Sequence, residues 1–212
     1  MTVLMRRTRI KICGITRPED ALAAAAAGVD AIGLIFAPRS QRRLTLEQAQ
    51  HIRSSLPPLV SCVALVMDQP ASEIKALLQQ LHIDLLQFHG SETPAFCASF
   101  GHPYIKAMAM GGAAAVADPA VWGSASGLLY DAHAPGGSGG SGEVFDWGRL
   151  PRDRSRPLLL AGGLKPANVA AAVREVQPYA VDVSSGVEIS PGIKDHALIN
   201  QFVEEVRRGD TG

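Results

Sequence analysis

Short runs of aliphatic and β-branched residues alternate along the chain with longer segments whose apolar residues recur at helical spacing. Brief, nearly continuous apolar runs are typical of strands buried on both faces, and the longer segments are typical of helices that cover them. The pattern predicts strands over residues 9–13, 31–36, 59–66, 85–88, 104–108, 127–130, 158–161 and 180–183. The chain therefore repeats a strand–helix unit eight times.

Helix starts and stops support this division. Thr16 and Glu19 have the spacing of a capping box before an alanine-rich helix that Gly28 would end, and Thr45 and Gln48 have the same spacing. Further helices are expected over 71–81, from Ser91 to about Gly101, over a weak alanine-rich stretch at 113–117, and over 167–176 and 196–207.

Strands that alternate with helices pair in parallel, and eight such units favour a closed barrel over an open sheet. An open doubly wound sheet usually carries a glycine fingerprint after its first strand, and residues 13–16 (CGIT) are no such fingerprint. We therefore predict a single-domain α/β protein, a (β/α)8 TIM barrel over residues 9–208. Residues 1–8 are expected to form a flexible extension and residues 209–212 a short tail.

Composition limits the partners and the location. The 212 residues have a formal net charge of zero, whereas nucleic-acid binding normally needs a basic excess, so no nucleic-acid partner is expected. No apolar run is long enough for a bilayer, so no membrane partner is expected. Cys13, Cys62 and Cys97 are an odd number without metal-ligand spacing, which argues against disulfides and a metal site and favours a cytoplasmic location.

Residues 158–195 contain two apolar runs that each break into small residues. Ala161-Gly162-Gly163 follows the first run and Ser184-Ser185-Gly186 follows the second, and each turn precedes a candidate helix start. Glycine lets the backbone approach a ligand closely, and N–H groups at helix starts attract anions. The loops after strands seven and eight of many barrels hold a phosphate in this way. We expect a phosphate site here, with two ordinary turns as the alternative.

Residues 132–143 (AHAPGGSGGSGE) are the low-complexity part of the sequence. In isolation this composition is that of a flexible interdomain linker. It directly follows a predicted strand, however, and structured sequence resumes at 145–147 (FDW). We favour a long loop on the catalytic face, a candidate lid, over the linker.

Catalytic groups of a (β/α)8 barrel lie at the carboxyl ends of its strands. The residues there are Cys13, Phe36 with the 38–43 loop, Asp68, Gln87 with His89, Lys106 and Asp131. The residues alone leave open whether Cys13 is reactive or an inert buried thiol, and whether Asp131 is an acid or a turn residue. Cys62 and Cys97 fall inside a strand and a helix and are expected in the core.

The 38–43 loop carries Arg39, Arg42 and Arg43. These arginines form either a solvated basic loop or a site for a second anionic group, since the planar guanidinium suits a carboxylate. Gln87 and His89 are expected to line the pocket rather than bind a metal, and His133 to be a mobile loop residue.

Six motifs occur in a fixed order: residues 11–16 (KICGIT), 87–90 (QFHG), Asp131 before the glycine-rich loop, 145–147 (FDW), 161–164 (AGGL), and 181–188 (VDVSSGVE) with the following 191–195 (PGIKD). Together they closely resemble the phosphoribosylanthranilate isomerase family of tryptophan biosynthesis, over about residues 9–206. Two features depart from that family: GGSG occurs twice within 136–142, and Phe88 stands where leucine is usual.

The resemblance implies an Amadori rearrangement of N-(5-phosphoribosyl)anthranilate to 1-(2-carboxyphenylamino)-1-deoxyribulose 5-phosphate. It needs no cofactor, because the substrate's own nitrogen acts as the electron sink. The family pattern makes Asp131 the general acid that protonates the ring oxygen and Cys13 the general base that takes the proton from C2. The implied substrate-binding residues are Arg42, for the anthranilate carboxylate, with Gln87, His89, Gly162, Gly163, Asp182, Ser184, Ser185 and Gly186.

The acid and base roles require shifted pKa values. Near neutral pH the pKa of Asp131 has to rise from about 3.9 and the pKa of Cys13 has to fall from about 8.5. Apolar surroundings raise a carboxyl pKa, and a nearby cation or helix N-terminus lowers a thiol pKa. We expect both shifts, and a monomer or homodimer as the assembled form.

Three alternative interpretations fit the sequence less well. A histidine-pathway sugar isomerase is expected to use two aspartates, whereas Cys13 occupies the first of those positions. A catalytically silent phosphate-binding module would gain support from the loss of Cys13 or Asp131, and both are present. A fusion with indole-glycerol-phosphate synthase is not expected, because the chain has no residues left for a second domain.

Overall fold

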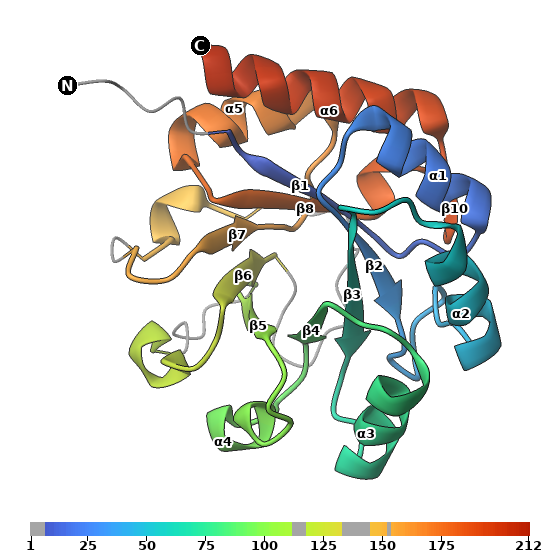
Figure 1. Ribbon diagram of the computed structural model, residues 1–212. Helices are drawn as coiled ribbons and strands as arrows, with labels where there is room; N and C mark the ends of the chain where they lie inside the picture. The colour runs from blue at the N-terminus through green and yellow to red at the C-terminus, as the bar shows by residue number, and fades with distance from the viewer. Residues whose placement is uncertain (1–6, 112–117, 133–144, 152–153) are drawn as a thin grey trace.

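The computed structural model describes residues 7–111, 118–132, 145–151 and 154–212. Eight parallel strands close into a barrel in chain order, and the last strand pairs with the first. Figure 1 shows the helices around the outside of this barrel. The strands are β1 (Arg9–Cys13), β2 (Ala31–Ile35), β3 (Ser61–Val66), β4 (Leu85–Phe88), β5 (Tyr104–Ala109), β6 (Gly127–Asp131), β7 (Leu158–Leu160) and β8 (Ala180–Val183). The predicted (β/α)8 barrel is confirmed.

The helices are α1 (Pro18–Ala27), α2 (Leu46–Ser55), α3 (Ala71–Gln80), α4 (Pro94–Ala98), α5 (Pro166–Val176) and α6 (His196–Thr211). After β5 and β6 the described residues contain short 3-10 turns, η1 (Pro119–Trp122) and η2 (Trp147–Arg149), in place of α-helices. The helix expected at 113–117, the loop at 133–143 with its lid or linker alternatives, and His133 lie outside the described residues.

Two layers of apolar side chains hold the barrel. Alternate strand residues such as Ile10 and Ile12 point outward and pack in the large core beneath the helices. The intervening residues point inward, where Ile105, Leu129 and Leu159 belong to a smaller cluster. Each fully buried aliphatic side chain contributes roughly 1.5–3 kcal/mol, so the two layers together supply the main stabilisation. Cys62 and Cys97 are fully buried in the outer layer, as predicted.

One predicted helix start is confirmed and one is displaced. Thr45 caps α2 as expected, because its hydroxyl accepts from the Gln48 N–H while the Gln48 side chain accepts from the Thr45 N–H. Ser91 does not cap the next predicted helix. Thr93 takes that place, since its hydroxyl accepts from the Phe96 N–H at 3.2 Å, and α4 begins two residues later than expected.

The predicted capping box of Thr16 and Glu19 is wrong. The Thr16 hydroxyl donates to the carbonyl of Gly192, far along the chain, and Thr16 lies one residue before the N-cap of α1. Arg17 stands at the N-cap without a side-chain cap, and Glu19 lies 3.3 Å from its guanidinium. Thr16 therefore contacts a residue distant in the sequence and does not cap α1.

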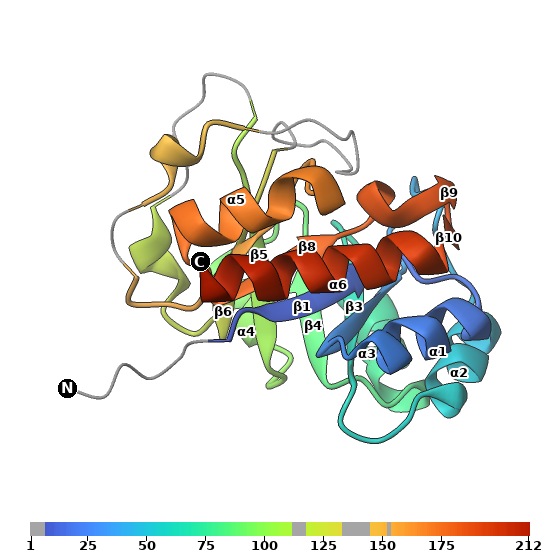
Figure 2. The same ribbon diagram turned by 90° about the horizontal axis from the view of Figure 1, so that it is seen from above.

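Between β8 and α6 the chain forms a hairpin that the sequence pattern did not predict. It consists of β9 (Glu188–Ser190) and β10 (Ile193–Lys194), which pair antiparallel. Figure 2 shows the hairpin beyond the N-terminal end of α6. The hairpin therefore stands at the carboxyl end of β8, beside the predicted phosphate turn.

The ordered barrel extends past the expected boundaries of 9–208 at both ends. Helix α6 continues to Thr211. Asp210 accepts hydrogen bonds from the N–H of Thr8 at 2.9 Å and from its hydroxyl at 2.6 Å. The two ends of the chain are thus tied together beside β1.

Candidate active site

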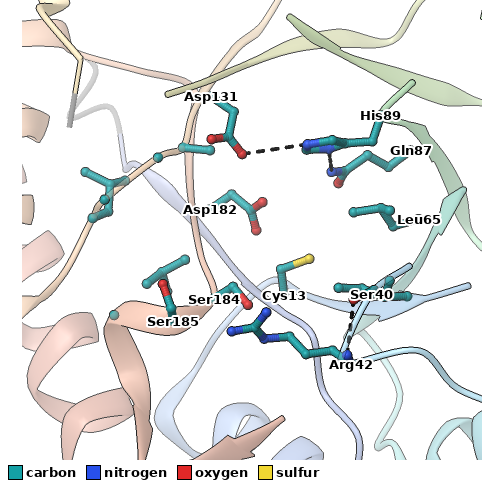
Figure 3. Close-up of a pocket in the computed structure, with 17 residues that line it drawn as sticks. Cys13, Ser40, Arg42, Leu65, Gln87, His89, Asp131, Asp182, Ser184 and Ser185 are labelled. Atoms are coloured by element: carbon teal, nitrogen blue, oxygen red, sulfur yellow. Dashed lines mark hydrogen bonds and ion pairs between the residues drawn. The ribbon is translucent and has the colours of Figure 1, made fainter. Parts of the chain in front are cut away.

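A pocket at the carboxyl ends of the strands brings the predicted site residues together (Figure 3). Strands β1, β2, β3, β4, β6 and β8 and the loops after β2, β4, β7 and β8 contribute to its wall. All the predicted site residues line it: Cys13, Arg42, Gln87, His89, Asp131, Gly162, Gly163, Asp182, Ser184, Ser185 and Gly186. Ser40, from the 38–43 loop, also lines the pocket, together with apolar residues that were not singled out as site residues: Ile35, Leu65, Leu164 and Val183.

Some residues at strand ends lie elsewhere. Lys106 is buried and pairs with Glu92, whose Oε2 lies 2.7 Å from the ammonium. Asp68 accepts from the N–H of Ser91 at 2.6 Å. Neither Lys106 nor Asp68 is among the residues that line the pocket, which shows that a strand-end position alone does not make a site residue.

The last residue of β6, Asp131, faces the imidazole of His89 across the pocket mouth. Asp131 Oδ2 lies 3.9 Å from His89 Nε2, and the other ring nitrogen, Nδ1, lies 3.2 Å from Gln87 Nε2. Gln87 and His89 are two residues apart, so both point into the barrel from the end of β4. All three side chains are buried, as expected for groups that line a closed reaction site.

On the opposite side Cys13 ends β1 and shares its inward face with Lys11. Lys11 pairs in register with Asp182 of β8, and its ammonium lies 2.8 Å from Asp182 Oδ1. The Lys11 ammonium and the Cys13 thiol also pack over the same point of Gly33, which has no side chain to separate them. Burial opposes the Lys11 charge, but the Asp182 carboxylate outweighs it and raises the pKa of Lys11. Lys11 therefore stays positively charged at neutral pH, beside the Cys13 thiol.

The expected fall of the Cys13 pKa is wrong. Burial raises the pKa of the Cys13 thiol above its usual value, and the neighbouring Lys11 only partly opposes this rise. Desolvation disfavours the thiolate because the closed barrel interior removes water from the sulfur. In the free protein Cys13 is therefore a protonated thiol at neutral pH.

Asp182 lies between Asp131 and Cys13 in Figure 3. Burial raises the pKa of Asp182, Lys11 opposes that rise, and the charge of the nearby Asp131 adds to it. The pocket thus holds two carboxylates whose charges disfavour one another.

The two turns of the predicted phosphate site, one after β7 and one after β8, lie in contact. Gly186 follows β8, and a Cβ placed on it would collide with the carbonyl oxygen of Leu164, which follows β7. Only glycine allows this approach. On the other side, the Asn168 side chain of α5 donates to the Gly163 carbonyl at 3.0 Å and accepts from the Lys165 N–H at 2.8 Å. The convergence that the sequence predicted is confirmed.

Arg42 reaches the pocket from the loop after β2, but Arg39 and Arg43 are not among its lining residues. Its Nε and Nη2 lie 2.8 and 2.6 Å from the two carboxylate oxygens of Glu188. The ammonium of Lys194, from β10, lies 2.7 Å from Glu188 Oε1. Sequence reasoning assigned no role to Glu188 or Lys194, because nothing local signals that the hairpin folds back onto the loop after β2.

Within the described residues, no group of three or more His, Cys, Asp and Glu side chains could hold a metal ion. In the same part of the chain no helix combines the length and the apolar character that crossing a membrane requires.

Known proteins are similar to this chain in sequence and in fold. A family model described as N-(5'phosphoribosyl)anthranilate (PRA) isomerase matches residues 10–205. An N-(5'-phosphoribosyl)anthranilate isomerase from Acidithiobacillus ferrooxidans is 54% identical over 205 residues, which are 96% of this chain and 99% of that protein.

Two solved structures are similar over most of the chain. Phosphoribosyl anthranilate isomerase from Thermus thermophilus superposes with a TM-score of 0.84 at 36% identity, covering 94% of this chain and 98% of that one. Another such isomerase, in complex with reduced 1-(o-carboxyphenylamino)-1-deoxyribulose 5-phosphate, has a TM-score of 0.75 at 34% identity and covers the same shares. The chain belongs to the N-(5'-phosphoribosyl)anthranilate isomerase family.

Proposed function

We propose that the pocket at the carboxyl ends of the strands performs the family's reaction with Asp131 as acid and Cys13 as base. The reaction is the isomerisation of N-(5'-phosphoribosyl)anthranilate in tryptophan biosynthesis. The observation that carries the proposal is that one pocket holds a carboxyl group, a thiol and two converging small-residue turns. An aldose–ketose isomerisation needs an acid, a base and a grip on the sugar phosphate, and all three are in place.

The acid opens the sugar. Asp131 donates its proton to the furanose ring oxygen, the C1–O bond breaks, and the anthranilate nitrogen forms a protonated Schiff base with C1. For this step Asp131 must be protonated. It is buried, and the carboxylate of Asp182 disfavours a second negative charge nearby.

The base then completes the transfer. Cys13 takes the proton from C2, which gives an enolamine that tautomerises to the ketone. The thiolate is the reactive form, and burial disfavours it in the free protein. Lys11 favours the thiolate, and the positive charge of the Schiff base adds to this effect once the ring has opened. The thiolate is thus most populated when it is needed to take the proton from C2.

The remaining groups bind the substrate. The phosphate sits against backbone N–H groups near Gly163, Ser185 and Gly186, where the two turns meet. Arg42 binds the anthranilate carboxylate, and Gln87 with His89 lines the wall between the acid and the base. No cofactor enters the scheme.

A direct test follows the loss of substrate fluorescence with the natural protein, Cys13→Ala and Asp131→Asn. We expect turnover by the natural protein and a fall of about 10²–10⁴-fold in each variant, the range typical of a lost general acid or base. Cys97→Ala is the matched control, because Cys97 is a buried thiol in α4 away from the pocket, and its turnover should stay near the natural value.

Two results would contradict the assignment. Turnover that survives in both variants would keep the reaction and remove this acid–base pair. A natural protein that binds the substrate without converting it would instead indicate a silent phosphate-binding module.

We also propose a cytoplasmic location and a monomer or homodimer as the assembled form. The three cysteines are free and buried, as suits a reducing compartment. Sedimentation equilibrium of the purified protein distinguishes the two assembled forms by mass.

A further inference from the structure

Arg42 is held in a fixed place between two loops. Its side chain is 14% exposed and packs over Gly14, where an added Cβ would lie 2.5 Å from Arg42 Cδ and 3.0 Å from Ser184 Oγ. Gly14 also has φ +73°, so the backbone itself favours glycine at this position. In Figure 3 the guanidinium lies below Cys13 and points toward Ser184.

Glu188 occupies one edge of that guanidinium. It accepts from Nε and Nη2 at 2.8 and 2.6 Å, which is the side-on bidentate geometry. A guanidinium has five N–H groups. Two of them point at Glu188, and of the remaining three, one on Nη1 and one on Nη2 form the edge that points away from Glu188. That remaining edge has the spacing for a second carboxylate.

Glu188 is shared between Arg42 and Lys194. The Lys194 ammonium is fully buried and lies 2.7 Å from Glu188 Oε1. It also donates to the carbonyls of Cys13 at 2.6 Å and Ser184 at 3.1 Å. Glu188 is thereby fixed between the two side chains, and Arg42 is the one of the two that lies in the pocket wall.

Burial lowers the pKa of Lys194, and the contact with Glu188 opposes this fall. Burial disfavours the Glu188 charge, but the hydrogen bonds and charges of Arg42 and Lys194 outweigh burial and lower the pKa of Glu188. The hydrogen bond to Glu188 raises the pKa of Arg42. Glu188 and Arg42 therefore both stay charged at neutral pH.

We propose that Glu188 is a positioning residue. Held by Lys194, it orients Arg42 so that the Nη1–Nη2 edge of the guanidinium faces a carboxylate on the substrate's aromatic ring. It thereby makes the site selective for an arylamine sugar phosphate that carries an ortho carboxylate over one that lacks it. The inference rests on the proposed function, because it requires Arg42 to be the group that binds this carboxylate.

The test compares two ligands by calorimetry: reduced 1-(o-carboxyphenylamino)-1-deoxyribulose 5-phosphate and the corresponding phenylamino compound without the carboxylate. The ratio of their dissociation constants measures selectivity for the carboxylate, because both ligands share the sugar phosphate. A bidentate charge-assisted pair predicts a ratio of about 10–100 for the natural protein. Arg42→Ala should bring the ratio close to one, and Glu188→Gln should bring it to within about threefold of the Arg42→Ala value.

Glu92→Gln is the matched control. It makes the same change at a buried glutamate that pairs with a buried lysine, Lys106, away from the pocket. The control should keep the natural ratio. A general loosening of the barrel would lower the affinity for both ligands and leave the ratio unchanged, so the ratio separates positioning of Arg42 from stability.

The outcomes distinguish this inference from the function on which it rests. If Arg42→Ala keeps the natural ratio, Arg42 does not bind the carboxylate, and both the Arg42 assignment and the positioning role fail. If Arg42→Ala abolishes the ratio but Glu188→Gln keeps it, the function stands and the positioning role of Glu188 is overturned. Where Glu188→Gln does not fold, Glu188→Asp replaces it: the shorter carboxylate still faces Lys194 but cannot reach both arginine nitrogens, so the ratio should again fall, and an unchanged ratio overturns the inference.

Discussion

At the scale of single residues, the chemistry of this site depends on a thiol that burial keeps protonated. Burial raises the pKa of all three thiols, and it raises the pKa of Cys62 and of Cys97 to about 12. What separates Cys13 from them is its place in the pocket wall and the cation of Lys11 beside it. Reactivity here is a property of the position rather than of the residue type.

This gives a prediction for the pH dependence of Cys13. A thiol whose pKa is raised stays protonated through neutral pH, so its rate of alkylation by iodoacetamide should increase about tenfold per pH unit through neutrality and beyond pH 9. Mass spectrometry of the peptides should find Cys13 modified before Cys62 and Cys97. A rate that levels off below pH 8 would contradict the raised pKa.

The same measurement tests the role of Lys11. In Lys11→Met the cation beside the thiol is gone, so the pKa of Cys13 should rise further and its alkylation at a given pH should slow, by about tenfold per pKa unit. Lys106→Met is the control, since it removes another buried lysine whose partner is Glu92. An equal slowing in both variants would show that loss of a buried charge, not the neighbouring cation, is responsible.

At the scale of elements, the proposed phosphate site depends on contact between the turn after β7 and the turn after β8. Gly186→Ala places a methyl group against the carbonyl of Leu164, so the turns must separate. We expect the affinity for the reduced product analogue to fall by roughly tenfold or more, because two backbone donors move apart.

The control for this variant is Gly123→Ala, where the nearest atom to an added Cβ is the end of the Arg156 side chain at 3.7 Å. That substitution should leave the affinity within about twofold of the natural value. Calorimetric titration of both variants checks the prediction, and equal affinities in the two would show that the turns tolerate the methyl group.

At the scale of the whole molecule, closure of the barrel joins the start of the chain to its end. Strands β1 and β8 pair, and Asp210 near the end of α6 accepts two hydrogen bonds from Thr8. Lys11 of β1 and Asp182 of β8 form an ion pair between the same two strands. The pair of strands that closes the barrel therefore also carries charged groups of the site.

We predict that Asp210→Ala lowers the free energy of unfolding by about 2 kcal/mol, because the Thr8 N–H and hydroxyl lose a charged acceptor. Urea denaturation measures this change. Glu204→Ala, on the exposed face of the same helix, should change the stability by less than about 0.5 kcal/mol. A similar small change for Asp210→Ala would mean that the two ends of the chain are held together by packing alone.

Much of this protein is determined by its sequence alone. Alternating apolar runs specify eight buried strands, since continuous hydrophobic strands between amphipathic helices pack stably only in a covered parallel sheet. The residues at the ends of those strands, Cys13 and Asp131 among them, then converge for a purely topological reason. The two turns with Gly163 and Gly186 were predictable on the same ground.

Only the tertiary structure decided the contacts between segments distant in the chain. Thr16 donates to the carbonyl of Gly192 and does not cap α1, and the hairpin that carries Glu188 and Lys194 folds onto Arg42. The pKa of Cys13 also rises where local reasoning expected a fall, because desolvation depends on everything that surrounds the thiol. Periodicity and strand ends are local properties of the chain, whereas hydrogen-bond competition, ion pairing and burial depend on which distant groups arrive at the same place.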